Sequence, residues 1–286
     1  MVGGDAVILC KAQNVSDGNA VDDLGRGKPV DLLGKDMFQP GIIVREGLPH
    51  LLAAVKALDD FRNVQAGLHV GVQEGLAGVI EAAGVLLFQQ VHHLFHHPLG
   101  CCGRPLKLAG ETDSARKMMK YNADLFRKHG ITTLVTSCPI CLKVFREDYD
   151  LPGIEILHHS EYILRLIRAG RLSLEHGAMR FTYHDPCELG RGSGIYDEPR
   201  AVIEAVGELL EPASTRENAL CCGSSVANTA ISDGQQVQIA RSVAAQLDAT
   251  GAEVIVTACP LCKKAIGRGT KSEVRDLAEI VVAAIK

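Results

Sequence analysis

An internal repeat with a period of about 120 residues constrains the fold of this chain more than any other feature. The segment GITTLVTSCPICLK (130–143) aligns with GAEVIVTACPLCKK (251–264), and both contain a Cys-Pro-x-Cys motif. A Cys-Cys-Gly triplet precedes each motif, at 101–103 and at 221–223. A repeat of this length is too long for a solenoid unit and has the size of a small domain. We therefore expect two tandem homologous domains.

A further aligned pair sets the domain limits. VIEAAGVLL (79–87) and VIEAVGELL (202–210) are identical at seven of nine positions, so the repeat extends upstream of both triplets. We predict a first domain at residues 57–175 and a second at 176–286. Residues 1–56 match neither copy and are dense in turn-forming residues. They are interpreted as an unassigned N-terminal extension, either a nonconserved segment or the product of a gene-start or reading-frame error.

Strand and helix patterns alternate along the second copy. The strand patterns are MRFTY (179–183) and EVIVT (253–257), whereas residues 198–207 and 228–251 have helical apolar spacing. Another helix is expected to start at the Cys-Pro-x-Cys motif, because proline suits a first helical turn. Alternation of this kind predicts an α/β fold in which each domain is a small parallel sheet flanked by helices. Sites in such sheets form at the carboxyl ends of the strands.

The cysteines are concentrated in the repeated part of the chain. Nine of the ten fall between positions 101 and 262. The start has no basic segment typical of a secretory signal and no apolar run approaches the roughly 20 residues that span a bilayer, so a cytoplasmic location is expected. In a reducing compartment the thiols are expected to be metal or redox ligands and not disulfides. The net charge of -4 and the 4% of aromatic residues argue against nucleic-acid binding.

The second copy places five thiols where they could converge. Cys187 is followed after 33 residues by Cys221 and Cys222, and after 36 more by Cys259 and Cys262. The last two stand at a helix start, where free N–H groups favour thiolates. Single zinc ions take four ligands, so five thiols favour an iron–sulfur cluster. A small zinc site, a redox dithiol and buried, inert cysteines are the alternative interpretations.

This pattern resembles the cysteine-rich CCG domain, whose members include the B and D subunits of heterodisulfide reductases. Related domains occur in lactate-utilisation and anaerobic glycerol-3-phosphate dehydrogenase systems. The resemblance covers about residues 57–286 and is strongest from 101 onward. In heterodisulfide reductases it implies a noncubane [4Fe–4S] cluster in each domain, held by five cysteines, that binds and reductively cleaves a disulfide. Carried onto this chain, the resemblance implies these cluster ligands in the second domain: Cys187, Cys221, Cys222, Cys259 and Cys262.

The first copy departs from the pattern because its upstream cysteine is missing. Position 187 maps to Val64, and Cys10 lies about fifty residues too early to replace it. The site could hold zinc, hold a second iron–sulfur cluster with four ligands, or be empty and structural. Its candidate metal ligands are Cys101, Cys102, Cys138 and Cys141.

These observations predict an oxidoreductase subunit that transfers electrons through the second-domain cluster to a disulfide or a small organic substrate. Cys187, Cys221 and Cys222 are the predicted catalytic residues, since they would hold the iron that meets substrate. No ferredoxin-type cysteine run and no dinucleotide loop is present, so a redox partner subunit, either flavoprotein or ferredoxin-like, is implied. Any membrane association would be peripheral, through that partner. The alternatives are an electron-transfer subunit of a lactate or glycerol-3-phosphate dehydrogenase-type complex and a non-catalytic zinc-binding scaffold.

Other polar residues carry weaker signals. His184 could hydrogen-bond to a cluster sulfur or simply shape the turn before Cys187. Arg191 could bind an anionic substrate or face solvent. Four histidines before the first triplet have the i, i+4 spacing of a helical metal pair, or else form a polar linker: His92, His93, His96 and His97.

Overall fold

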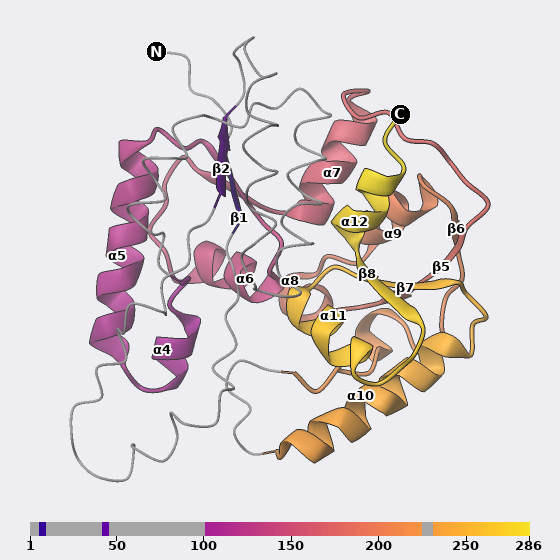
Figure 1. The fold of residues 1–286 in the computed structure, drawn as a ribbon. Helices are drawn as coiled ribbons and strands as arrows, with labels where there is room; N and C mark the ends of the chain where they lie inside the picture. The colour runs from indigo at the N-terminus through magenta and orange to yellow at the C-terminus, as the bar shows by residue number, and fades with distance from the viewer. Residues whose placement is uncertain (1–5, 10–41, 46–100, 225–230) are drawn as a thin grey trace, which may run out of the picture.

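The computed structural model describes residues 6–9, 42–45, 101–224 and 231–286 (Figure 1). Near the N-terminus, β1 (Ala6–Leu9) pairs with β2 (Ile42–Arg45) in antiparallel fashion. The described elements between residues 101 and 175 are α4 (Arg104–Leu108), α5 (Thr112–Lys128), β3 (Thr133–Thr136), α6 (Pro139–Glu147), β4 (Glu155–His158) and α7 (His159–Arg168).

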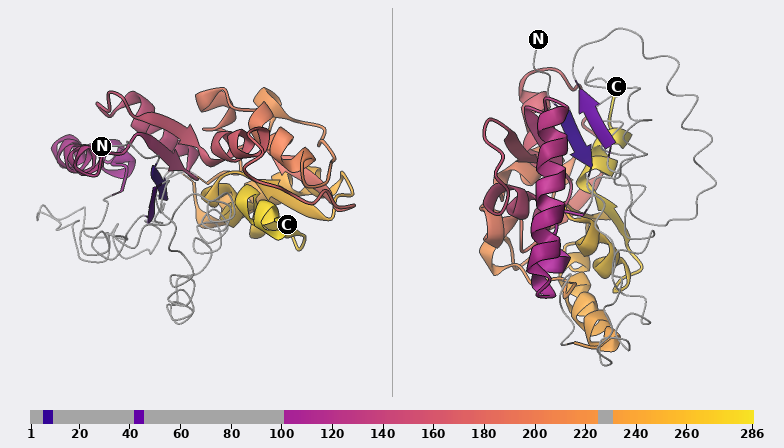
Figure 2. Two further views of the ribbon diagram at one scale, coloured as in Figure 1. Left: turned by 90° about the horizontal axis from the view of Figure 1, so that it is seen from above. Right: turned by 90° about the vertical axis from the view of Figure 1, so that its left-hand side faces the viewer.

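The remaining elements form the second half. They are β5 (Arg180–His184), α8 (Gly190–Ser193), α9 (Asp197–Glu204), β6 (Glu208–Leu209), the 3₁₀ helix η3 (Arg216–Asn218), α10 (Asp233–Asp248), β7 (Val254–Thr257), α11 (Pro260–Gly267), β8 (Glu273–Asp276) and α12 (Leu277–Ala283). The left view of Figure 2 shows α5 (magenta) and the C-terminal elements β8 and α12 (yellow) on opposite sides of the molecule, and in the right view α5 faces the viewer.

The internal repeat is visible in the order of the elements. The series α5, β3, α6, β4, α7 of the first half recurs as α10, β7, α11, β8, α12 in the second. In both copies the first cysteine of the Cys-Pro-x-Cys motif is the N-cap of a helix with proline in its first turn. The tandem α/β organisation predicted from the sequence is therefore confirmed, whereas the domain limits at residues 57 and 176 stay a prediction.

The two sheets of the described repeat, between residues 101 and 286, are parallel, as the alternation of strands and helices predicted. One contains β3 and β4, and the other has the order β6-β5-β7-β8. At the central pair of the larger sheet, His184 of β5 lies opposite Thr257 of β7. The segments that follow these two strands therefore leave the sheet at the same edge.

Helix α10 is shorter than the sequence pattern predicted. It begins after Ser232, whose side chain accepts a hydrogen bond from the N–H of Gln235, and Gln235 bonds back to Ser232 in a capping box. The prediction of a helix over 228–251 missed this cap. Residues 225–230 lie outside the described part of the chain.

Apolar side chains of both halves form the core. The largest cluster joins the β5–β7 sheet to α7, α9 and α12, with Tyr162 and Tyr183 among its fully buried members. Within the described residues, no helix has the length and apolarity needed to cross a membrane.

Candidate functional site

The second-half thiols gather at the carboxyl edge of the larger sheet. Cys187 follows β5 by three residues, and Cys259 follows the neighbouring β7 by two. Because β5 and β7 are parallel and in register at His184 and Thr257, both cysteines lie at one edge. This is the arrangement that the alternation of strands and helices predicted.

The structure brings the five thiols together, with two pairs in close contact. The Sγ atoms of Cys187 and Cys221 are 3.9 Å apart, and those of Cys222 and Cys262 are 3.3 Å apart. Cys222, Cys259 and Cys262 are buried, whereas Cys187 is half-buried and Cys221 is exposed. The Cys187–Cys221 pair is therefore the solvent-facing side of the group.

The thiols shift one another's acidity. A hydrogen bond with the Cys187 thiol, supported by one with Cys222, lowers the pKa of Cys221, and the same Cys187–Cys221 bond raises the pKa of Cys187. Hydrogen bonding with Cys262 likewise lowers the pKa of Cys259. In the metal-free protein, protons are thus shared within the group, and a metal that binds thiolates would release them.

Gly223 makes the turn behind the Cys221–Cys222 pair. Its φ is +77°, a left-handed conformation that costs little only for glycine. A Cβ built there would lie 2.8 Å from Cγ2 of Ile239 on α10, closer than a real contact allows. The triplet therefore ends in glycine for two independent reasons, backbone conformation and space.

We predict that Gly223→Ala lowers the free energy of unfolding by about 2–3 kcal/mol, since it adds a clash to an unfavourable φ. Gly110 is the matched control, because its φ is +83° and a Cβ there would meet nothing within 4 Å. Gly110→Ala should cost only about 1 kcal/mol. Urea unfolding of both variants measures the difference, and equal losses would contradict the role assigned to Ile239.

Two polar residues flank Cys187 and reach the segment before the second triplet. His184 donates from Nε2 to the carbonyl oxygen of Leu220 at 3.1 Å, and its Nδ1 lies 3.4 Å from Oγ1 of Thr257. Neither hydrogen bond reaches sulfur, so the geometry favours the turn-shaping interpretation of His184. Arg191 donates from Nη1 to backbone carbonyls of that same segment. Arg191 is exposed, in agreement with the solvent-facing interpretation, and these bonds add a role that its sequence position did not indicate.

Asp185 and Arg200 form a buried ion pair beneath the Cys187 turn. The Arg200 guanidinium donates to both carboxylate oxygens of Asp185 at 2.8 Å, and the side chains of Arg200 and Asp185 are 6% and 4% exposed. Burial opposes the charge on Arg200, but hydrogen bonds with Asp185 and Glu211 raise its pKa. The pattern of the sequence did not indicate this pair, because its members lie on separate elements.

The four thiols of the first half lie at the matching edge of the smaller sheet. Cys102, Cys138 and Cys141 are buried and Cys101 is half-buried. Hydrogen bonds with Cys101 and Cys141 lower the pKa of Cys102. The structure thus brings these predicted metal ligands together as well.

The two thiol groups adjoin each other. Ile140, inside the first Cys-Pro-x-Cys motif, packs against the cluster of buried residues that contains Cys222, Cys259 and Cys262. Lys143 of α6 donates from Nζ to the carbonyl oxygen of Gly192, in the short helix after Cys187, at 3.2 Å. Groups bound at the two sites would therefore be neighbours.

A buried polar group at the carboxyl ends of β4 and β8 was missed by the sequence reasoning. His158 and His159 are fully buried with ring centroids 4.3 Å apart, and His159 Nε2 lies 3.6 Å from Oδ1 of Asp276. His158 and Asp276 are equivalent N-caps in the two copies. Burial lowers the pKa of His159 to about 3, so its ring is neutral near pH 7. His158, His159 and Asp276 belong to no motif or repeated spacing that would indicate a buried polar group.

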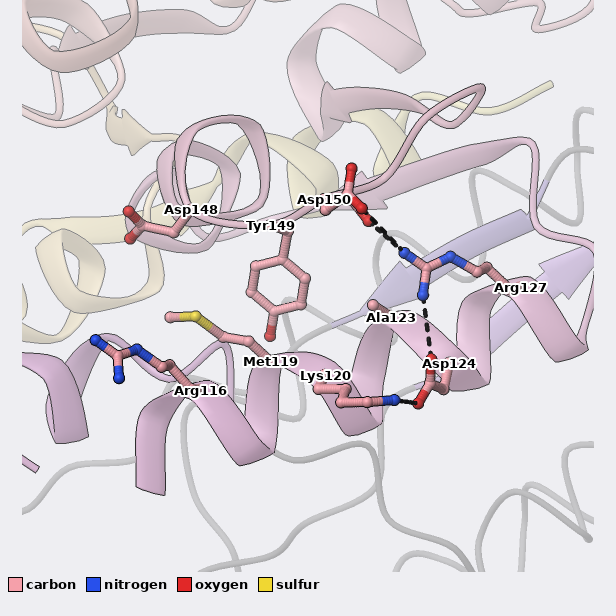
Figure 3. Close-up of a pocket in the computed structure, with 9 residues that line it drawn as sticks. All are labelled: Arg116, Met119, Lys120, Ala123, Asp124, Arg127, Asp148, Tyr149 and Asp150. Atoms are coloured by element: carbon pink, nitrogen blue, oxygen red, sulfur yellow. Dashed lines mark hydrogen bonds and ion pairs between the residues drawn. The ribbon is translucent and has the colours of Figure 1, made fainter. Parts of the chain in front are cut away.

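The pocket of Figure 3 lies between α5 and residues 148–150, which follow α6, and its lining includes no cysteine. Its volume is about 360 Å³, and Tyr149 forms part of its wall. Two of its basic side chains, Lys120 and Arg127, pair with Asp124. The Tyr149 hydroxyl links the pocket to the first triplet, but it donates to the backbone carbonyl of Cys102. We therefore assign no site to it.

Some sequence predictions concern residues outside the described ranges. These are Cys10, Val64, and the four histidines His92, His93, His96 and His97. The metal interpretation of the histidines stays a prediction.

The donor set suits a polynuclear group more than a single ion. Among the described residues, no three His, Cys, Asp or Glu side chains are grouped as the ligands of one ion would be. The five second-half thiols contact one another in a series instead, from Cys187 through Cys221, Cys222 and Cys262 to Cys259, and a cluster presents several iron atoms to separate cysteines. In residue type and number, these five thiols suit an iron–sulfur cluster.

A comparison with protein families decides the classification. The family described as "Cysteine-rich domain" (CCG) matches residues 82–146 and 181–267, which together make up just over half of the chain. The chain belongs to the cysteine-rich CCG family. The two matched segments contain all nine cysteines of the repeat. The first segment ends within α6, and the second ends at the last residue of α11.

Curated proteins of similar sequence are longer than this chain. An EtfAB:quinone oxidoreductase of Syntrophomonas wolfei is 29% identical over 204 residues, which cover 65% of this chain and 29% of that protein. The D-type subunit of the dihydromethanophenazine:CoB–CoM heterodisulfide reductase of Methanosarcina barkeri is 29% identical over 202 residues, 65% of this chain and 49% of the relative. The chain thus spans less than half the length of these relatives. Among solved structures, a putative Asp/Glu racemase from Yersinia pestis aligns at 15% identity over 75% of this chain and 90% of that one, with a TM-score of 0.33 that carries no weight.

Proposed function

We propose that this CCG protein is the iron–sulfur subunit of an oxidoreductase, and that a [4Fe–4S] cluster in its second domain transfers electrons to a disulfide or small organic substrate. The observation that carries the proposal is the convergence of five thiols from three separate segments on one sheet edge. The relatives support it, since they include an EtfAB:quinone oxidoreductase and a heterodisulfide reductase component.

In this proposal Cys187, Cys221, Cys222, Cys259 and Cys262 hold the cluster. The cluster would supply the one-electron chemistry. The chain's own residues would bind it, bury three of its thiols from solvent, and leave Cys187 and Cys221 at the accessible side. A substrate would reach the site there, which agrees with the catalytic role predicted for Cys187 and Cys221. Cys222, the third predicted catalytic residue, is buried and would act as a ligand from inside the group.

The first domain would hold zinc or a second cluster on Cys101, Cys102, Cys138 and Cys141. Its contact with the second thiol group through Ile140 favours an electron-transfer role, because neighbouring redox groups can exchange electrons. Reduction of a disulfide consumes two electrons and two protons and yields two thiols, so an electron donor is required. A flavoprotein or ferredoxin-like partner would be that donor.

Anaerobic purification of the full chain tests the proposal. We expect brown protein that contains about four iron and four sulfide per occupied cluster site, the composition of a [4Fe–4S] group. Colourless protein with stoichiometric zinc and no sulfide would reject it in favour of the zinc-binding scaffold.

A further inference from the structure

Two segments of the second domain meet at the accessible thiol pair. One runs from His184 to Arg191 and carries Cys187, and the other runs from Arg216 to Leu220 and leads directly into Cys221. No strand pairing joins the two segments, because His184 is the only residue of either segment that belongs to the sheet. Something else must therefore hold Cys221 beside Cys187.

The inner side of this junction is held by two buried residues of the first segment. Asp185 accepts a hydrogen bond from the backbone N–H of Arg216 at 2.8 Å, and His184 donates to the carbonyl oxygen of Leu220 at 3.1 Å. Arg216 has a φ of +57° and is the only non-glycine residue with a positive φ in the described part of the chain. Its hydrogen bond to Asp185 helps to fix that unfavourable conformation.

The outer side is held by one side chain. Nη1 of Arg191 donates to the carbonyl oxygens of Glu217 at 2.9 Å and Ala219 at 2.8 Å. Hydrogen bonds from a charged donor are stronger than neutral ones, and these two meet the carbonyls on either side of Asn218. Arg191 thereby joins the short helix after Cys187 to the residues just before the Cys-Cys-Gly triplet.

We propose that Arg191 is a positioning residue that holds the Cys221 thiol against Cys187 and so sets the geometry of the solvent-facing side of the site. The side chain acts through the backbone of residues 217–219. The geometric claim concerns the thiols alone. Its consequence, that a substrate meets a preformed Cys187–Cys221 pair, rests on the proposed function and deepens it.

Thiol crosslinking in the full, cluster-free chain tests the claim. Diamide takes two electrons and two protons from a pair of adjacent thiols, which become a disulfide while its azo bond becomes a hydrazine. The rate at which Cys187 and Cys221 crosslink reports how often their thiols meet, and the buried Cys222–Cys262 pair is an internal reference in the same molecule. Mass spectrometry identifies each disulfide, with fragment ions that separate Cys221 from Cys222.

Arg191→Gln should slow Cys187–Cys221 crosslinking by about tenfold relative to the Cys222–Cys262 reference, as expected when charge-assisted hydrogen bonds on an exposed loop are lost. Arg191→Lys should restore part of the rate, because lysine keeps a charged donor. Arg241→Gln, an exposed arginine on α10, is the matched control and should change nothing.

An unchanged ratio of the two rates in Arg191→Gln would overturn the proposal. Equal slowing of both pairs would also overturn it, because that result means general loosening of the domain. Neither result depends on iron, so a failure here is distinguishable from a failure of the cluster proposal, which the iron and sulfide content tests.

Discussion

Replacement of Cys187 by serine is expected to remove the metal group of the second domain and to leave the first-domain site intact. Cys187 is the one thiol of the second group that comes from the segment after β5, so the other four cannot replace it from their positions on the triplet and α11. Loss of an outer hydrogen-bond partner alone lowers metal affinity roughly 10–100-fold, and loss of a ligand should cost more.

The measurement is the iron and sulfide content of anaerobic protein, together with the electron paramagnetic resonance spectrum after stepwise reduction. Cys187→Ser should lose the second-domain signal, and substrate reduction should fall at least about 100-fold. Cys10→Ser is the matched control, since it removes a thiol outside the repeat. If Cys187→Ser kept the same spectrum and iron content as the unaltered chain, Cys187 would not be a ligand.

The repeat and the thiol edge could be predicted because local signals carry them. An apolar run predicts the strand Val254–Thr257, and a proline directly after a cysteine predicts the helix that starts at Pro260. Once strands alternate with helices, a parallel sheet puts Cys187 and Cys259 at one edge. No long-range contact had to be known for that conclusion.

What the sequence did not show depends on contacts between distant residues. Arg191 and Ala219 are 28 positions apart, and Asp185 and Arg200 belong to different elements, so neither pairing has a periodic signature. His158 gives no N-cap signal, because serine, threonine, aspartate and asparagine are the usual caps. These polar contacts form only when the chain is folded and packed. The contacts around Cys187 help to position the accessible thiols.

The Asp185–Arg200 pair is another contact between distant residues. Its loss is expected to have the largest effect on the free energy of unfolding. The pair links the turn before Cys187 to α9, and Asp185 also receives the N–H of Arg216, so one carboxylate connects three segments. Arg200 lies 5.2 Å from the ring centre of buried Tyr183, so water cannot readily replace a lost partner. Removal of one member of a buried pair leaves the other charge uncompensated.

We therefore predict that Asp185→Ala lowers the free energy of unfolding by about 3 kcal/mol. This value is at the low end of the roughly 3–5 kcal/mol typical of a broken buried ion pair, because Glu211 still pairs with Arg200. Asp197→Ala is the matched control. It removes an exposed carboxylate that pairs with Arg216 at 2.6 Å, and it should cost less than about 1 kcal/mol. Urea unfolding of the cluster-free chain measures both values.

The double variant Asp185→Leu with Arg200→Met separates charge from shape. If the loss in Asp185→Ala comes from an unpaired guanidinium, two apolar side chains should recover most of it and leave the domain within about 1–2 kcal/mol of the unaltered chain. The N–H of Arg216 still lacks its acceptor in that variant. Cys187–Cys221 crosslinking should therefore stay slow even where stability returns, since the position of the residues leading to Cys221 depends on the carboxylate and not on the net charge. Recovery of the crosslinking rate together with stability would show instead that Asp185 acts only through the fold.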